Sequence, residues 1–181
     1  MKNKSDLLWA TLGEGGLILV ISVIAWFARQ PLIFSSLGPT AYEAAELPQM
    51  RSSRAYNVIV GHFVGLAAGF LALYVTGAWT APHALTTGIV TPPRIWSMTI
   101  AVVLTTIVNL LLRSSQPAAL ATTLLVAEGS MQTERDAIAI ILGVLLIALI
   151  GTPLRRFRLK HTRVRRAIEH FHDEPHQLQP S

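Results

Sequence analysis

Four long apolar segments dominate the hydropathy pattern of this chain. They cover residues 7–27, 57–78, 95–112 and 137–154, and among Asp, Glu, Lys and Arg they contain a single residue, Glu14 in the first. A helix that crosses a bilayer needs about 20 mainly apolar residues, whereas soluble core helices of this length usually keep a polar face. The four tryptophans lie near the segment ends, where amphipathic rings favour the headgroup level. The pattern therefore predicts an all-α membrane protein with four transmembrane helices.

Two shorter segments lie between these spans. Ser35-Ser36-Leu37-Gly38-Pro39 follows the first span, and Ser114-Ser115-Gln116-Pro117 follows the third. Each leads into a short stretch rich in small and apolar residues, over about 39–47 and 117–127. Because Pro suits the first turn of a helix and Ser can cap it, each stretch is predicted to be helical. We expect two re-entrant half-helices. The alternative is a pair of helices lying flat at the membrane surface.

The order span, Ser-Ser, Pro, short helix, span occurs twice and forms a weak internal repeat. Because each copy contains two full spans, we expect two parallel repeats, related by an axis along the membrane normal. If both half-helices dip into the bilayer, their N-termini meet near its middle. A helix N-terminus offers free N–H groups and about half an elementary positive charge. Two such ends would bind an anion without a charged side chain.

Composition and charge support the membrane assignment. The chain is 51% hydrophobic and 14% charged, with a mean hydropathy of +0.47, whereas soluble domains carry about 25% charged residues. Cysteine is lacking, so disulfides are excluded. We divide the chain into a transmembrane domain over 1–154 and a basic cytoplasmic tail over 155–181. Seven of the fifteen Lys and Arg residues begin this tail, which indicates a membrane flank rather than a nucleic-acid-binding arm: Arg155, Arg156, Arg158, Lys160, Arg163, Arg165 and Arg166.

The basic residues also predict an orientation. Four spans place both termini on one side, and the positive-inside rule favours the cytoplasm as that side, as in a protein of a bacterial inner membrane. The inner face would then hold the seven tail residues with Lys2, Lys4 and Arg94. The outer face would hold Arg29, Arg51, Arg54, Arg113 and Arg135.

Polar residues inside the spans are functional candidates, because a charge there costs on the order of several kcal/mol. Glu14 and His62 are candidates for proton coupling. The alternatives are an interfacial carboxylate and a structurally hydrogen-bonded histidine. Glu43 and Glu46, close behind Pro39, would repel an anion unless they lie near the surface end of the short helix. Glycines that repeat every four residues predict close packing of the second span against another helix: Gly61, Gly65 and Gly69.

Three strings of residues resemble the HPP family of small integral membrane proteins. They are Gly38-Pro39-Thr40-Ala41, Arg54-x-x-Asn57-Val58-Ile59-x-Gly61-His62 and Arg113-x-x-Gln116-Pro117-Ala118-x-x-Ala121-Thr122. The similarity covers about residues 7–159. It implies four spans and, from the plastid and cyanobacterial members, an association with nitrite transport. The chain departs from the family where Gln116-Pro117-Ala118 replaces the His-Pro-Pro motif.

The sequence and the resemblance together favour transport or channel-like permeation of a small inorganic anion such as nitrite. We expect no enzymatic activity, catalytic residue, metal or cofactor. The expected partners are the lipid bilayer, the anion and further copies of the chain, with no nucleic acid. The alternative is a non-transporting assembly or regulatory protein that acts through its basic tail. The candidate substrate-binding residues are Gly38, Pro39, Thr40, Ala41, Arg54, Asn57, Arg113, Gln116, Pro117, Ala118 and Thr122.

Overall fold

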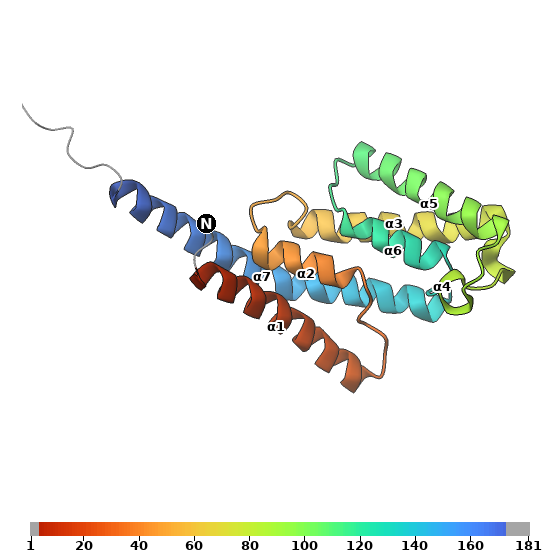
Figure 1. The fold of residues 1–181 in the computed structure, drawn as a ribbon, viewed down its shortest axis with the longest axis horizontal. Coiled ribbons are helices and arrows are strands. Elements are labelled where there is room, and N and C mark those ends of the chain that lie inside the picture. Colours follow the sequence, from red (N-terminus) through yellow and green to blue (C-terminus); the bar gives the residue numbers. More distant parts are fainter. Residues whose placement is uncertain (1–3, 173–181) are drawn as a thin grey trace, which may run out of the picture.

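The computed structural model describes the backbone of residues 4–172 and the side chains of residues 6–160. The last part of the predicted tail, 173–181, lies outside the described residues. The described chain forms helices that pack along one another (Figure 1). In chain order they are α1 Lys4–Ala28, α2 Leu37–Glu46, α3 Ala55–Thr76, the 3-10 turn η1 Ala78–Thr80, α4 Ala84–Thr87, α5 Pro92–Leu111, α6 Ala118–Ala127 and α7 Glu134–His172.

Four of these helices are apolar and long enough to cross a membrane, which confirms the predicted spans. The crossing stretches are Asp6–Ala28, Ala55–Thr76, Pro92–Leu111 and Glu134–Lys160. The third begins upstream of the predicted residue 95, so Arg94 lies within α5. The two short helices, α2 and α6, occur where the Ser and Pro residues predict them.

The bundle has two ends that side-chain contacts define. At one end, Arg158 of α7 forms an ion pair of 3.9 Å with Asp6 of α1. Arg155 of α7 also donates from Nε to Ser53 Oγ, just before α3, at 2.9 Å. We call this the terminal end, because α1 begins there and the apolar part of α7 finishes there.

The opposite end, which we call the loop end, gathers the other connections. Arg135 of α7 donates to the carbonyl oxygen of Arg29 at 3.3 Å, so α1 finishes there. Arg94 of α5 donates to the carbonyl oxygen of Ala127 at 3.2 Å and to Gln132 Oε1 at 3.1 Å. The start of α5, the end of α6 and the start of α7 therefore lie together at the loop end.

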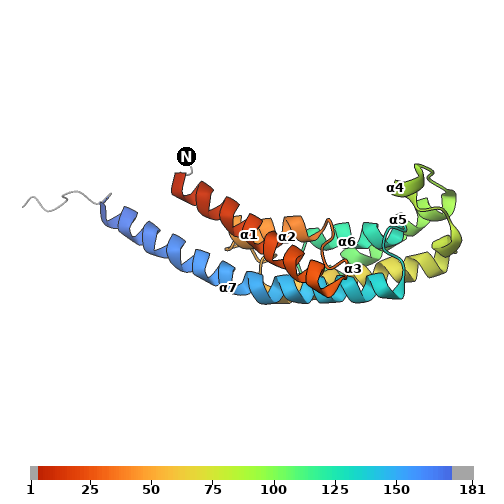
Figure 2. The same cartoon turned by 90° about the horizontal axis from the view of Figure 1, so that it is seen from below.

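These contacts fix the direction of every helix. At the terminal end, Tyr56 of α3 donates to the carbonyl oxygen of Leu112 at 3.1 Å, so α5 finishes there. The carbonyl oxygen of Ala45 accepts from Arg158 Nε at 3.0 Å, so α2 also finishes at the terminal end. Helices α1, α3 and α6 thus run toward the loop end, and α2, α5 and α7 run toward the terminal end, as Figures 1 and 2 show.

The expectation of two parallel repeats is therefore wrong. The unit α1–α2–α3 and the unit α5–α6–α7 run in opposite directions. The reason is that residues 29–36, which lie outside any helix, together with α2 cross the bundle from the loop end back to the terminal end. Each unit consequently crosses three times rather than twice. A re-entrant segment enters a membrane and leaves it on the same side. Here the segment that contains α2 starts at the loop end and finishes at the terminal end, so it is not re-entrant.

This direction also corrects the expected distribution of basic residues. Arg51 donates to the carbonyl oxygen of Arg113 at 3.5 Å, which places both loops at the terminal end with the basic start of the tail. Arg54, at the N-terminus of α3, lies there too. Arg94, which we expected on the same side as the termini, lies at the loop end.

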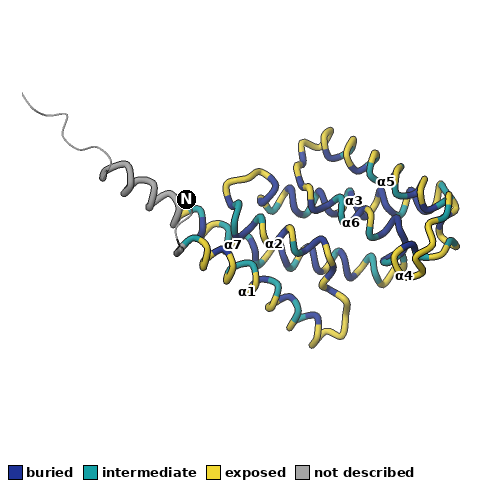
Figure 3. Tube along the Cα trace, viewed as in Figure 1, coloured by how far each residue is buried: buried dark blue, intermediate teal, exposed yellow. Residues whose placement is uncertain are grey.

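Close packing of α3 against α6 explains the glycine repeat. A Cβ atom on Gly61, Gly65 or Gly69 would lie between 2.6 and 2.8 Å from atoms of Gln116, Ala119, Thr123 or Val126, which is too close for a carbon atom. Figure 3 shows that the buried parts of the chain lie along α3, α6 and the facing side of α7, while α1 and α5 expose much of their outer faces. The predicted packing role of the glycines is confirmed.

The topology predicts where introduced thiols react. Cysteine is absent from the sequence, so Gln49→Cys and Glu134→Cys each supply a single label site. Both positions are exposed, Gln49 at the terminal end and Glu134 at the loop end. A membrane-impermeant maleimide added to sealed vesicles should label only one of the two variants. Labelling of both from the same side would restore the four-crossing arrangement with parallel repeats. Thr86→Cys, in the exposed loop before α5, is the control and should behave like Glu134→Cys.

Candidate functional site

The N-terminal ends of α2 and α6 meet inside the bundle. Ser36, which precedes α2, and Thr122, in the second turn of α6, place their hydroxyl oxygens 2.6 Å apart. Both residues are fully buried. From this meeting point the two half-helices run in opposite directions, and the two views agree that they lie nearly end to end (Figures 1 and 2).

A buried histidine of α3 joins the two half-helices. His62 has no exposed surface. Its Nδ1 lies 2.7 Å from Thr122 Oγ1 of α6, and its Nε2 lies 3.1 Å from Thr40 Oγ1 of α2. A neutral imidazole donates through one nitrogen and accepts through the other, while a hydroxyl can do either. We call Ser36, Thr40, His62 and Thr122 the hydroxyl–histidine network.

Gln116, just before α6, extends this network toward α2. One terminal atom of its amide lies 3.4 Å from Thr40 Oγ1. The acceptors around the other atom assign the amide nitrogen to that position, where it donates to Glu43 Oε2 at 2.9 Å and to the Ser52 carbonyl oxygen at 3.2 Å. The Glu43 carboxylate is therefore bound by an amide donor on the terminal-end side of the network.

The network lies near the middle of the apolar stretch of α7. Thr40, Val58 and Ile147 line the same small cavity, and Ile147 is close to the centre of the apolar residues 137–154. The volume of this cavity is about 10 Å³. Such a volume holds at most about one water molecule. This cavity is therefore too small for an anion larger than a water molecule.

Backbone donors remain available at both tips. Neither α2 nor α6 has a side chain capping its N-terminus. Within the described chain, the backbone N–H groups of Gly38 and Ala118 find no acceptor. Pro39 and Pro117 have exposed side chains beside these tips. The two half-helices thus present unpaired N–H groups close to the hydroxyl–histidine network.

The other predicted site residues fall into different places. Asn57 accepts from the Ser115 backbone N–H at 3.2 Å and donates to the Arg51 carbonyl oxygen, so it joins the loops that precede α3 and α6. Arg54 and Arg113 are exposed at the terminal end rather than at the tips. Ala41 is fully buried in α2. Glu14 is half-buried in α1, and no contact joins it to the network within the described residues.

Three buried polar residues that contact the half-helices or their tips were not among the predicted site residues. Ser36 belongs to the repeated Ser-Ser pair, and that repetition is the signal that could have identified it. Arg94 and Arg158 are almost completely buried, with 0% and 4% of their surface exposed. In the sequence, both resemble ordinary basic residues at the edge of an apolar span, so no sequence signal distinguishes them.

Comparison with known proteins agrees with the resemblance found in the sequence. The family model described as "HPP, transmembrane region" matches residues 1–163. No curated protein matches the chain, and no solved structure does so either. The match covers all of the helices that build the hydroxyl–histidine network.

Removal of the Thr122 hydroxyl tests whether the network stabilises the fold. Thr122→Val keeps the side-chain shape but leaves Ser36 and His62 without their shared partner. An unsatisfied buried group costs about 1–3 kcal/mol, so we expect the unfolding temperature of the detergent-purified protein to fall by several degrees. Thr106→Val, at an exposed position of α5, is the matched control and should unfold as the unmodified protein does. Equal unfolding temperatures for both variants would show that the network contributes no stability.

Proposed function

The chain belongs to the HPP family of integral membrane proteins, and on that premise we propose that it passes a small inorganic anion such as nitrite across the membrane. The observation that carries this proposal is the meeting of two half-helix N-termini at a buried cluster of hydroxyl groups. The anion would bind to the hydroxyl–histidine network and to the free backbone N–H groups of Gly38 and Ala118.

Electrostatics favour an anion at this place. Each half-helix carries about half an elementary positive charge at its N-terminus. The two positive ends face one another in an apolar bundle, where electrostatic interactions are stronger than in water. A small anion between them would lower the mutual repulsion of the two ends and accept hydrogen bonds from Gly38, Ala118 and the hydroxyl groups. The two positive ends would repel a cation at the same place, and the Glu43 carboxylate lies on the terminal-end side, where the Gln116 amide binds it.

Passage requires the tips to move, because the cavity beside Thr40 holds at most about one water molecule. The direct polar contacts between the two half-helix segments include the Ser36–Thr122 pair and the contacts of Gln116 with Thr40 and Glu43. We propose that the anion replaces the Ser36–Thr122 contact and accepts a hydrogen bond from each hydroxyl. His62 remains the candidate for proton coupling, because a protonated imidazole would add a positive charge beside the anion.

We also propose that the terminal end faces the cytoplasm, as in a bacterial inner membrane. Arg51, Arg54 and Arg113 lie at that end with the basic start of the tail, whereas the basic residues at the loop end are Arg29, Arg94 and Arg135. This excess follows the positive-inside rule. The thiol-labelling experiment decides the orientation, since Glu134→Cys should react from outside intact cells.

A homo-oligomer is the expected functional form. The Pro39 and Pro117 side chains are exposed beside the half-helix tips, where lipid cannot satisfy polar backbone groups. A second copy covering this surface would enclose the tips in protein. Light scattering on the purified protein should therefore give a protein mass of two or more chains, each of 19.7 kDa. A monomer mass would contradict this part of the proposal.

The alternative function is that of an assembly or regulatory protein acting through its basic tail. The observation that favours it is the length of α7, which continues as a helix from its apolar stretch through the basic residues to His172. Such a helix could carry a basic surface away from the membrane. This alternative requires no movement of the half-helices.

Flux measurements separate the two functions. We expect liposomes containing the purified protein to take up nitrite with saturation. Parallel assays with nitrate, formate and chloride, with and without a pH gradient, would define selectivity and coupling. A chain lacking residues 161–181 should keep the flux, whereas Thr122→Val should change it and Thr106→Val should not. If no anion enters, the transport proposal is wrong and the tail-based alternative is favoured.

A further inference from the structure

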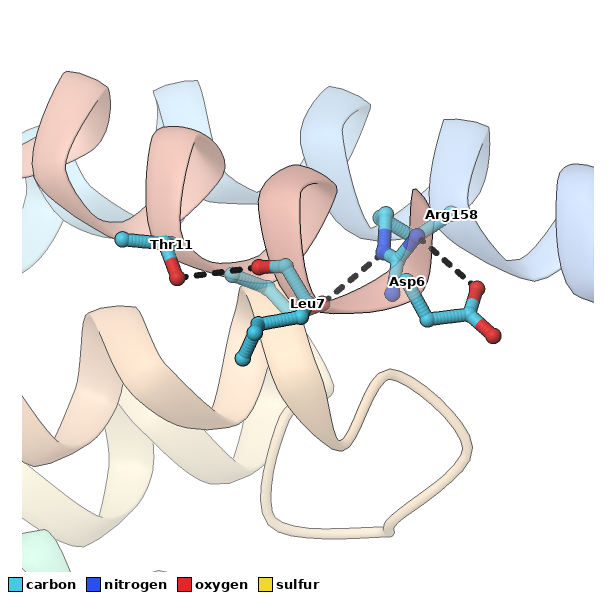
Figure 4. A network of polar contacts seen from close by, with 5 residues as sticks. Asp6, Leu7, Thr11 and Arg158 are labelled. Carbon is cyan, nitrogen blue, oxygen red and sulfur yellow. Dashed lines mark hydrogen bonds and ion pairs between the residues drawn. The ribbon is translucent and has the colours of Figure 1, made fainter. Parts of the chain in front are cut away.

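Each half-helix is held at its C-terminal end by a buried arginine. For α2 this residue is Arg158 of α7, whose Nε donates to the carbonyl oxygen of Ala45 at 3.0 Å. Figure 4 shows the guanidinium group of Arg158 reaching from α7 toward Asp6 at the start of α1. Arg158 thus connects the C-terminus of α2 to two long helices at the terminal end.

For α6 the corresponding residue is Arg94 of α5. Its Nη1 donates to the carbonyl oxygen of Ala127, the last residue of α6, at 3.2 Å. The same guanidinium group donates to the carbonyl oxygens of Pro82 at 3.0 Å and Ala81 at 2.7 Å. Gly129 provides the space, because a Cβ atom there would lie 2.5 Å from Arg94 Nη2. This is a fixed site for one guanidinium group at the loop end.

The two ends of the half-helices therefore differ in a regular way. At the C-terminus of α6, the carbonyl oxygens of residues 124–127 all accept hydrogen bonds: three from backbone N–H groups that follow the helix and one from Arg94. A cation at a helix C-terminus stabilises the helix dipole. At the N-termini, Gly38 and Ala118 keep unpaired N–H groups within the described chain. An arginine is therefore bound at each negative end, whereas one backbone N–H group at each positive end lacks an acceptor within the described chain.

We propose that Arg94 and Arg158 are positioning residues that fix the two half-helices from their outer ends, so that their N-terminal tips face one another at the anion site. This inference rests on the proposed function. An arginine has the geometry for the task, because its planar group holds several carbonyl oxygens at once, while lysine offers a compact charge without the fork. Both arginines act through the half-helices and do not contact the network themselves.

Distances between the tips provide a test that does not depend on transport. The sequence contains no cysteine, so Ser35→Cys and Ser115→Cys, both at exposed positions, can carry a pair of spin labels. In the otherwise unmodified chain we expect one narrow distance distribution. Arg158→Gln and Arg94→Gln should each broaden it by about twofold, because the helix loses its fixed cation. Arg156→Gln, at an exposed position of α7, is the matched control and should leave the distribution narrow.

Transport assays on the same variants give the functional half of the test. Arg158→Gln and Arg94→Gln should raise the half-saturating nitrite concentration by about fivefold, as expected for the loss of a helix-terminus charge interaction. If a Gln variant does not accumulate in the membrane, the Lys variant replaces it, with a smaller change in the same direction. Lys keeps the charge but loses the multiple hydrogen bonds.

The outcomes distinguish this inference from the proposed function. Broadened distances in a protein that transports no anion would support the positioning role and remove the transport proposal. Narrow distances and unchanged half-saturation in all arginine variants would overturn the positioning role and leave the transport proposal in place. A broadened distribution in the Arg156→Gln control would also count against the inference, because the effect would not be specific to the buried pair.

Discussion

Polar backbone groups at the ends of the two half-helices determine how this bundle is built. A helix that stops inside an apolar bundle leaves N–H groups at its start and C=O groups at its end without intrahelical partners. In a membrane, such groups must be satisfied by protein or must line a polar site. Here Arg94 and Arg158 each bind one C-terminal carbonyl oxygen, and backbone N–H groups bind the others at the end of α6. One N–H group at each N-terminus, on Gly38 and on Ala118, lacks an acceptor within the described chain, and we propose that these groups line the anion site.

The rest of the fold brings those ends together. Glycines along α3 let α6 approach closely, which brings Thr122 within hydrogen-bond distance of His62. A Cβ atom on Gly143 of α7 would collide with the carbonyl oxygen of Leu32, so the glycine lets the non-helical residues 29–36 lie against α7 on their way to α2. Each half-helix, together with the non-helical residues before it, passes through the bundle once. Each unit therefore passes through three times, and the unit α5–α6–α7 starts at the end opposite to the start of α1–α2–α3.

Much of this arrangement could be predicted from the sequence. Apolar runs of about 20 residues predicted the four spans, and the Ser and Pro residues predicted the two short helices. Thr40, Gln116 and Thr122 became candidates through the resemblance to the HPP family, and the structure places all three close to one another. The helix directions could not be predicted, because a hydropathy search looks for apolar runs of about 20 residues. Residues 29–36 are not helical and α2 has only ten residues, so neither is recognised as part of a crossing. The arginine contacts could not be predicted either. Their partners are backbone carbonyl groups 33 and 113 residues away, and any residue type presents such a group.

The anion site requires that the half-helix tips touch, and disulfide trapping detects this contact. Ser36→Cys with Thr122→Cys replaces two hydroxyl oxygens that lie 2.6 Å apart. Mild oxidation of the double variant in native membranes should form a disulfide within one chain, so that both thiols escape maleimide labelling after denaturation and reappear on reduction. Two freely labelled thiols after oxidation would mean that the tips lie apart in the membrane. The anion site described here would then not exist.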